Sequence, residues 1–268
     1  VQPRRAQVGV EDVQVQVTAV GVVDDMVDVD VARPDHAGHL AFADDQQGHH
    51  SDQEQFEKTD IEHFALCLLL LVFLANSSAP EIDGDLADWK ADKAVQWDAG
   101  SKRIIKAKVR RDAENLYFAY EVPDTTPMVN NGPDYQLLFE SGDCVDFWLR
   151  TDAENETKSP IRGDIRLMFS VYKGKPVAVL MEQKAAQKKN PFDFRSPARS
   201  IPFDRVEILT GAKVVFKRSL MGYTFEASVP VKEIGHKLPG GTTIGDAGVI
   251  FSDVDGNESL QRSCWSNK

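Results

Sequence analysis

The composition divides this chain of 268 residues at Ala79. Residues 1–79 hold 4 Lys and Arg against 14 Asp and Glu, whereas residues 80–268 hold 27 against 28, so the net charge of −11 belongs almost entirely to the first part. The second part is long enough to bury a full core as one domain. It contains no basic stripe, so we expect no nucleic acid as a partner.

The first sixty residues have the composition of a disordered segment. They contain no Trp or Tyr, and they include polar stretches such as A-D-D-Q-Q-G-H-H-S-D-Q-E-Q. The histidines of this segment could bind a metal ion, although their scattered spacing without cysteine does not match a known metal-binding pattern. We expect residues 1–60 to be a disordered extension, or a spurious one that lies upstream of the true start.

The segment 61–79 resembles a secretion signal. Residues 64–75 form an uncharged run of 12, too short to cross a bilayer of ~30 Å as a helix but typical of a signal-peptide core. Ser77 and Ala79 are small residues at the positions that precede a cleavage after Ala79. The alternatives are a buried helix or an uncleaved anchor. We expect a secreted or periplasmic protein with no stable membrane span after cleavage.

Beyond residue 80 the pattern is that of short strands separated by Gly, Pro, Asn and Asp. Alternation of apolar and polar residues predicts strands at 103–111, 115–122, 143–151, 164–172, 212–218 and 222–230. The only helical signal is one or two turns after Pro230, ended by Gly235. The stretch 188–203 contains three prolines and is predicted to be an irregular loop, of a kind that is often functional. The fold class is all-β: an antiparallel, immunoglobulin-like or jelly-roll-like β-sandwich over residues 80–268.

The strand at 143–151 has two distinct faces. Val145, Phe147 and Leu149 share one, which is predicted to point into the core against Leu116, Phe118 and Tyr120. Cys144, Asp146, Trp148 and Arg150 share the other, predicted to be the outer face of the sheet. Two cysteines after residue 79, Cys144 and Cys264, either pair once or remain buried thiols.

Several motifs follow one another in a characteristic order. They are I-D-G-D-L-A-D-W, L-Y-F-A-Y-E-V-P-D, G-D-C-V-D-F-W-L, F-E-A-S-V-P, I-G-D-A-G-V-I-F-S-D-V-D-G and Q-R-S-C-W-S. Taken individually, Asp83-Gly84 suits a tight turn and Trp89 suits a core position. Together the series resembles the family 9 carbohydrate-binding modules and the wider DOMON-like sandwiches, over residues 81–268. In that family the Ile-Asp-Gly opening begins the mature module.

The resemblance implies a non-catalytic module that binds a polysaccharide or oligosaccharide. Asp146 and Arg166 match the acid and the arginine of the family's sugar site, and Phe139 and Trp148 are the aromatic residues nearest to it. A tryptophan expected before Gly142 is absent, and so is a second one beyond Trp265, as if the last strand were missing. We therefore expect weak binding of sugar chain ends at the sheet edge.

Besides sugar binding, the sequence leaves a calcium site, a structural or interaction domain and a haem-binding module open. Asp253, Asp255 and Asn257 lie in one turn that suits calcium, although a polar hairpin turn needs the same residues without metal. No nucleophile or phosphate-binding motif accompanies His236, the one histidine after residue 79, so no enzyme is expected. The alternatives to sugar binding are a structural or interaction domain and a haem-binding DOMON-type module with an axial methionine, for which the candidates are Met128, Met168, Met181 and Met221.

Overall fold

The computed structural model describes residues 70–72, 79–152, 157, 159–196, 200–238 and 242–266. All of them belong to one of the two compact units of the chain, Gln46–Lys268. The predicted extension at residues 1–60 lies outside the described residues. So does the predicted signal segment, apart from Ala79 and the short strand β1 (Leu70–Val72), which pairs with β13. Both of these therefore remain predictions.

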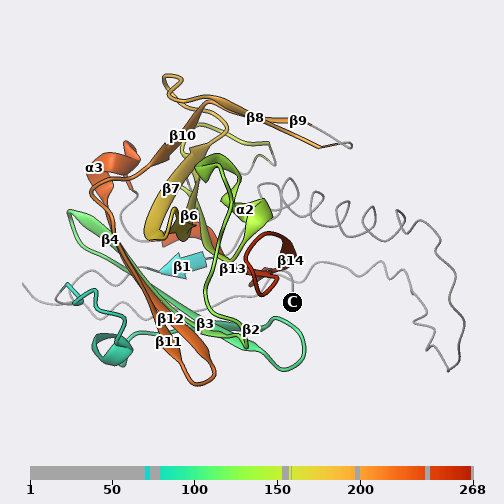
Figure 1. Cartoon of the computed structure of the whole chain (residues 1–268). Helices are drawn as coiled ribbons and strands as arrows, with labels where there is room; N and C mark the ends of the chain where they lie inside the picture. The colour runs from blue at the N-terminus through green and yellow to red at the C-terminus, as the bar shows by residue number, and fades with distance from the viewer. Residues whose placement is uncertain are drawn as a thin grey trace, which may run out of the picture. The chain divides into compact units, whose positions relative to one another are not determined.

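Two antiparallel sheets form a sandwich, as the sequence predicts (Figure 1). The larger sheet has the strand order β1-β13-β5-β6-β7-β10, with β14 paired to the end of β13. Its further strands are β5 (Cys144–Arg150), β6 (Asp164–Tyr172), β7 (Lys175–Glu182), β10 (Arg205–Ile208), β13 (Thr242–Ser252) and β14 (Ser259–Cys264). The five-stranded sheet, in spatial order, contains β11 (Lys213–Ser219), β12 (Gly222–Pro230), β4 (Asn115–Pro123), β3 (Ile104–Arg111) and β2 (Val95–Asp98).

The core between the sheets confirms the predicted strand face. Phe147 is fully buried, and its ring centroid lies 5.0 Å from that of Phe118 on the facing sheet. Phe169 continues this aromatic stack, 5.2 Å from Phe118 and 4.9 Å from Phe225. The other residues predicted to meet there belong to the same cluster: Val145, Leu149, Leu116 and Tyr120.

The Ile-Asp-Gly opening packs on the outer face of the five-stranded sheet. Trp89 ends a short 3-10 helix, η1 (Leu86–Trp89), and is completely buried, as its predicted core position requires. The carboxylate of Glu226 on β12 accepts hydrogen bonds from Trp89 Nε1 at 2.6 Å, Gly84 N at 2.5 Å and Asp83 N at 3.1 Å. Gly84 has a φ of +83°, and a Cβ there would lie 2.7 Å from Lys217 Cβ. Only glycine therefore fits this turn.

A second apolar layer covers the outer face of the larger sheet. It consists of the turn made by η2 (Tyr135–Leu137) and α2 (Leu138–Ser141) and of a separate two-stranded hairpin, β8 (Phe192–Arg195) with β9 (Ser200–Phe203). The prediction of an irregular loop at 188–203 was therefore wrong in part. Paired backbone hydrogen bonds and the burial of Phe194, Ile201 and Phe203 order this segment despite its prolines.

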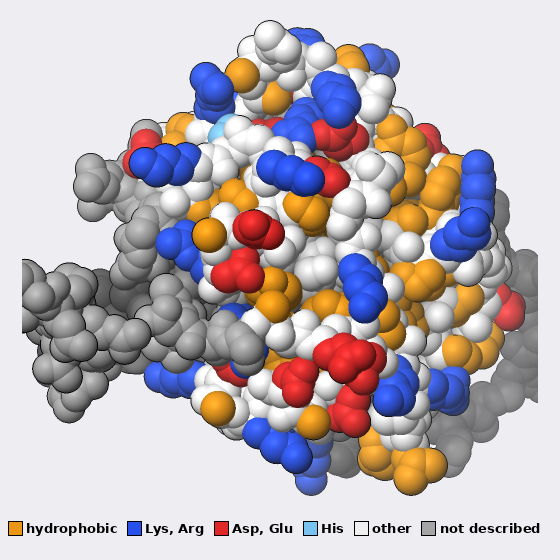
Figure 2. Space-filling view, turned by 90° about the vertical axis from the view of Figure 1, so that its left-hand side faces the viewer, with side chains coloured by type: hydrophobic (Ala, Val, Ile, Leu, Met, Phe, Trp, Pro, Cys, Tyr) orange, Lys and Arg blue, Asp and Glu red, His pale blue; other side chains and the backbone are white. Residues whose placement is uncertain are grey.

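The structure also tests the predicted helical turn, the two cysteines and the surface charge. The predicted helical turn is α3 (Val231–Ile234), and it ends at Gly235 in the left-handed conformation. Cys144 and Cys264 are both buried free thiols. Lys and Arg are interspersed with Asp and Glu on the face shown in Figure 2, in line with the balanced charge of residues 80–268. Among the described residues, no helix is both long and apolar enough to cross a membrane.

Candidate functional site

An ion pair between β5 and β6 forms the centre of the candidate site. Trp148 faces Arg166 across these neighbouring strands, so Asp146 lies diagonally beside Arg166 on the same face of the sheet. The guanidinium of Arg166 donates to both carboxylate oxygens of Asp146, from Nε to Oδ1 at 3.0 Å and from Nη2 to Oδ2 at 2.8 Å. Two parallel charge-assisted bonds fix the plane and direction of the guanidinium.

Aromatic rings flank this pair. The guanidinium carbon of Arg166 lies 4.8 Å from the centroid of the Phe139 ring and 5.2 Å from that of Trp148, both within cation–π range. Trp148 packs closely over β13, because a Cβ on Gly248 would lie only 2.8 Å from its ring. Sequence reasoning placed all four residues in one site, and the structure brings them together: Asp146, Arg166, Phe139 and Trp148.

A second arginine belongs to the same cluster. The side chain of Arg262 on β14 is buried, and its Nη2 lies 3.9 Å from Asp146 Oδ2. Its guanidinium carbon is 5.9 Å from the Trp148 ring centroid. Burial lowers the pKa of Arg262 to about 10. Sequence reasoning missed this residue, although it lies within the Q-R-S-C-W-S motif.

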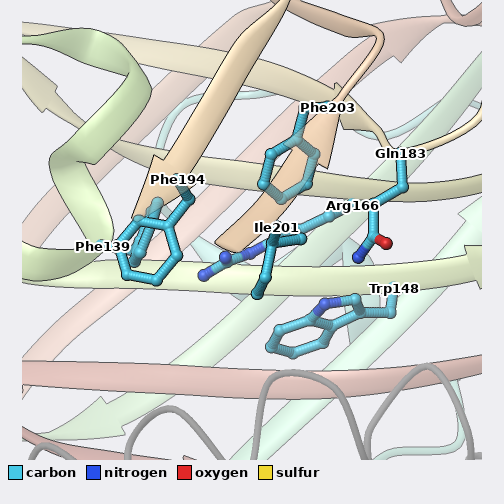
Figure 3. Close-up of a pocket in the computed structure, with 7 residues that line it drawn as sticks. All are labelled: Phe139, Trp148, Arg166, Gln183, Phe194, Ile201 and Phe203. Carbon is cyan, nitrogen blue, oxygen red and sulfur yellow. The ribbon is translucent and has the colours of Figure 1, made fainter. Parts of the chain in front are cut away.

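A small hollow opens above Arg166 (Figure 3). Its volume is about 310 Å³, including the space at its open mouth. The hairpin β8–β9 contributes three apolar side chains, and the amide of Gln183 points toward Trp148. The full lining is Phe139, Trp148, Arg166, Gln183, Phe194, Ile201 and Phe203.

The surroundings of these residues differ from the prediction in two respects. Asp146 and Arg166 lie on β5 and β6, central strands of the larger sheet, and not at its edge. They are also buried, with side-chain exposures of 0% and 3%, and Trp148 is 5% exposed, because the second apolar layer covers the outer face. Strand alternation indicates the side on which a residue lies, but it does not indicate what covers that side.

The predicted calcium turn at 253–257 is closed by contacts within the protein. Asp253 Oδ1 accepts the backbone N–H groups of Asn257 at 2.8 Å and Glu258 at 3.1 Å, and these donors lower the pKa of Asp253. The backbone carbonyl of Asp255 accepts from Asn131 Nδ2 at 2.6 Å. No three His, Cys, Asp or Glu side chains gather into a metal-binding group anywhere in the described ranges. Calcium in this turn stays a prediction.

His236 takes part in an ion cluster that joins α3 to the larger sheet. Its Nε2 contacts the buried carboxylate of Glu182, which also pairs with Arg205 Nη1 at 2.9 Å. Arg205 in turn donates to the carbonyl of Ile234 at 2.7 Å, at the end of α3. These contacts hold the end of α3 against the strands β7 and β10.

The candidate haem ligands lie in different environments. Met168 and Met181 are fully buried in the second apolar layer, whereas Met221 is exposed at the tip of the β11–β12 hairpin. Met128 is half-buried against the core between the sheets. The two buried methionines fill space within the second apolar layer, which is the usual role of this residue in a core.

Among solved structures, this structure is similar to two of a family 9 carbohydrate-binding module from Caldicellulosiruptor kristjanssonii. The one in complex with glucose is 16% identical with a TM-score of 0.40, over 72% of this chain and 84% of the other. The one in complex with cellotriose is 17% identical with a TM-score of 0.41, over 72% and 83%. No family model matches the chain, and no curated protein sequence matches it significantly.

Proposed function

We propose that the chain is a non-catalytic carbohydrate-binding module and that its sugar occupies the hollow above Arg166. The observation that carries this proposal is the position of the Arg166 guanidinium, held by Asp146 and set against two aromatic rings at the base of the hollow. A pyranose offers hydroxyl groups for charged partners and apolar C–H faces for an indole, so this combination of groups suits a sugar.

The groups at the hollow have complementary roles. Arg166 uses Nε and one Nη2 hydrogen for Asp146, so Nη1 and the second Nη2 hydrogen can donate to sugar hydroxyls. The amide of Gln183 supplies a donor and an acceptor on the opposite wall, and Trp148 supplies the apolar surface (Figure 3). A single indole leaves one sugar face without a stacking partner, so we expect affinity of about 1 mM.

The shape of the hollow favours the end of a sugar chain. Ligand pockets usually span about 300–1,000 Å³, and the enclosed part of this hollow is far smaller than that, so it has to widen before it can hold a sugar ring. Phe194, Ile201 and Phe203 close one side, so a long chain cannot pass across Arg166 in both directions. These three side chains are only 4–6% exposed, and sugar entry therefore requires the β8–β9 hairpin to move outward.

Export from the cytoplasm belongs to the same proposal and rests on the signal-like segment 61–79. Cleavage after Ala79 would leave a mature chain that begins at Pro80, next to the Ile-Asp-Gly opening. The intact mass of the protein recovered outside the cytoplasm tests this, and a recovered chain that still contains residues 1–60 would contradict it.

Calorimetric titration with cello- and xylo-oligosaccharides tests the sugar site. Gln183→Ala removes a polar group from the wall without touching the ion pair, and we expect it to weaken binding by about 5- to 10-fold, the effect of one lost hydrogen bond. The matched control is Gln96→Ala, an exposed glutamine on β2 of the other sheet, which should bind like the wild type.

Arg166→Ala should abolish binding, but it also leaves the buried Asp146 carboxylate unpaired and destabilises the fold. Its folded state must therefore be verified by circular dichroism. Sugar binding unchanged by both Gln183→Ala and a folded Arg166→Ala would place the site elsewhere. Absence of binding to any oligosaccharide would favour the structural or interaction domain.

A further inference from the structure

The charge on the walls of the hollow is positive. Of the described residues that line it, Arg166 alone carries a charge, and the others are one amide, Gln183, and aromatic or aliphatic side chains (Figure 3). A ligand that enters the hollow therefore meets a cation and no carboxylate in its lining. Electrostatic complementarity between a site and its ligand favours an anionic group at this position over a neutral one.

The hydrogen bonds of this guanidinium leave a second fork of donors for a ligand. A guanidinium has five N–H groups, which form one parallel pair on Nε and Nη2 and another on Nη1 and Nη2. Asp146 takes the first pair, through Nε at 3.0 Å and Nη2 at 2.8 Å. The second pair has no acceptor among the described residues. A planar carboxylate matches such a fork with two charge-assisted bonds, and a neutral hydroxyl does not.

Arg262 adds a second positive charge to the ion pair. Its Nη2 lies 3.9 Å from Asp146 Oδ2, so the carboxylate of Asp146 lies between two guanidinium groups. Burial lowers the pKa of Arg262 to about 10, which still leaves it protonated at neutral pH. Another buried carboxylate on this face, Asp246, accepts the N–H of Ser266 at 3.2 Å and its hydroxyl at 2.8 Å, and it does not line the hollow. The carboxylate of Asp146 therefore does not prevent Arg166 from attracting a further anion.

We propose that the sugar of the hollow is a uronic acid at the end of a chain, and that its carboxylate binds the second fork of Arg166. This inference rests on the proposed function and names the class of ligand for the same site. The ring of a uronic acid also offers an apolar C–H face to Trp148 and hydroxyl groups to Gln183. The hollow has to widen for it as for a neutral sugar.

Calorimetric titration of the full chain with matched ligands tests the inference. The ligands are methyl β-D-glucuronide, its uronate methyl ester and methyl β-D-glucoside, which differ only in the group at C6. We expect the acid to bind about 10-fold more tightly than either neutral ligand, since charge-assisted hydrogen bonds are about twice as strong as neutral ones. An ester or a glucoside that binds as tightly as the acid would overturn the inference and leave the sugar site intact. Absence of binding by every sugar, acidic or neutral, would overturn the proposed function as well.

Gln183→Glu reverses the electrostatics of the opposite wall without touching the ion pair. Glutamate has nearly the shape of glutamine, and its carboxylate repels an acidic sugar across the hollow. We expect this variant to lose the preference of about 10-fold for the glucuronide over the glucoside. Gln96→Glu, on β2 of the other sheet, is the matched control and should keep the preference. A preference that Gln183→Glu leaves unchanged would contradict binding of the carboxylate in the hollow.

Arg166→Lys separates the fork from the charge. Lysine keeps the positive charge but presents a single ammonium group in place of two parallel donors. With its fold verified by circular dichroism, this variant should retain less than about a third of the preference for the acid. A full preference in the folded variant would overturn the role of the fork. The ligand series and Gln183→Glu decide the proposal even if Arg166→Lys does not fold.

Discussion

Replacing Glu226 with alanine is expected to lower the free energy of unfolding by about 3–5 kcal/mol, measured by chemical denaturation. Its carboxylate accepts from Trp89 Nε1, Gly84 N and Asp83 N, and it is completely buried. Removal leaves three donors without an acceptor, of which Trp89 Nε1 and Gly84 N are buried. Each unsatisfied buried donor costs about 1–3 kcal/mol, although such costs do not add fully. The opening segment should then detach from the five-stranded sheet, and the fluorescence of Trp89 should report it.

Glu121 provides the control for this variant. It lies on the neighbouring strand β4, is 43% exposed and pairs with Lys106 at 2.9 Å. Exposed pairs of this kind contribute about 0–1 kcal/mol, so Glu121→Ala should be nearly neutral. Equal effects of the two substitutions would show that Glu226 does not hold the opening segment in place.

Phe147→Ala should destabilise the protein by about 3–5 kcal/mol, because it opens a cavity in the centre of the core. The side chain is fully buried and packs on Phe118 of the facing sheet at a centroid distance of 5.0 Å. Loss of this ring removes a contact that joins the two sheets. The free energy of unfolding in urea measures the effect.

Leu220, at the exposed tip of the β11–β12 hairpin, provides the control for Phe147→Ala. Leu220 has a relative exposure of 103%, so Leu220→Ala removes a side chain that buries nothing and should change stability by less than about 0.5 kcal/mol. A denaturation midpoint for Phe147→Ala equal to that of Leu220→Ala would mean that the inward face of β5 is wrongly assigned.

Much of the sandwich follows from alternation in the sequence. The residues Val145, Phe147 and Leu149 recur at every second position, and a period of two residues predicts a strand with these three on one face. The same reasoning located the strands at 115–122, 164–172 and 222–230. These elements depend on neighbours in sequence, which is why one sequence is enough to find them.

The parts that escaped prediction depend on contacts between distant residues. Nothing near Trp89 indicates that its indole donates to Glu226, 137 positions further along the chain. The hairpin β8–β9 is also hidden in the sequence, because its prolines resemble those of an open loop. Its apolar side chains Phe194, Ile201 and Phe203 were a usable signal, since three large hydrophobic residues in a loop need a surface to cover.

The candidate site was partly accessible from the sequence. Asp146 and Arg166 were found through their resemblance to a family motif, and pairing of β5 with β6 accounts for their contact. Arg262 and Gln183 were missed, because they reach the site from β14 and from the residue after β7. Their role depends on the order of strands in the sheet, which no local pattern reveals.

Hydrogen–deuterium exchange with and without oligosaccharide tests most directly whether sugar enters the hollow beneath the β8–β9 hairpin. Amides of β8 and β9 should exchange readily in the free protein, because entry requires this hairpin to move, and a saturating oligosaccharide should slow their exchange. Amides of β11 and β12, on the opposite sheet, should not change and provide the internal reference. Slower exchange confined to β11 and β12, or none at β8 and β9 under conditions where calorimetry detects binding, would contradict the proposed site.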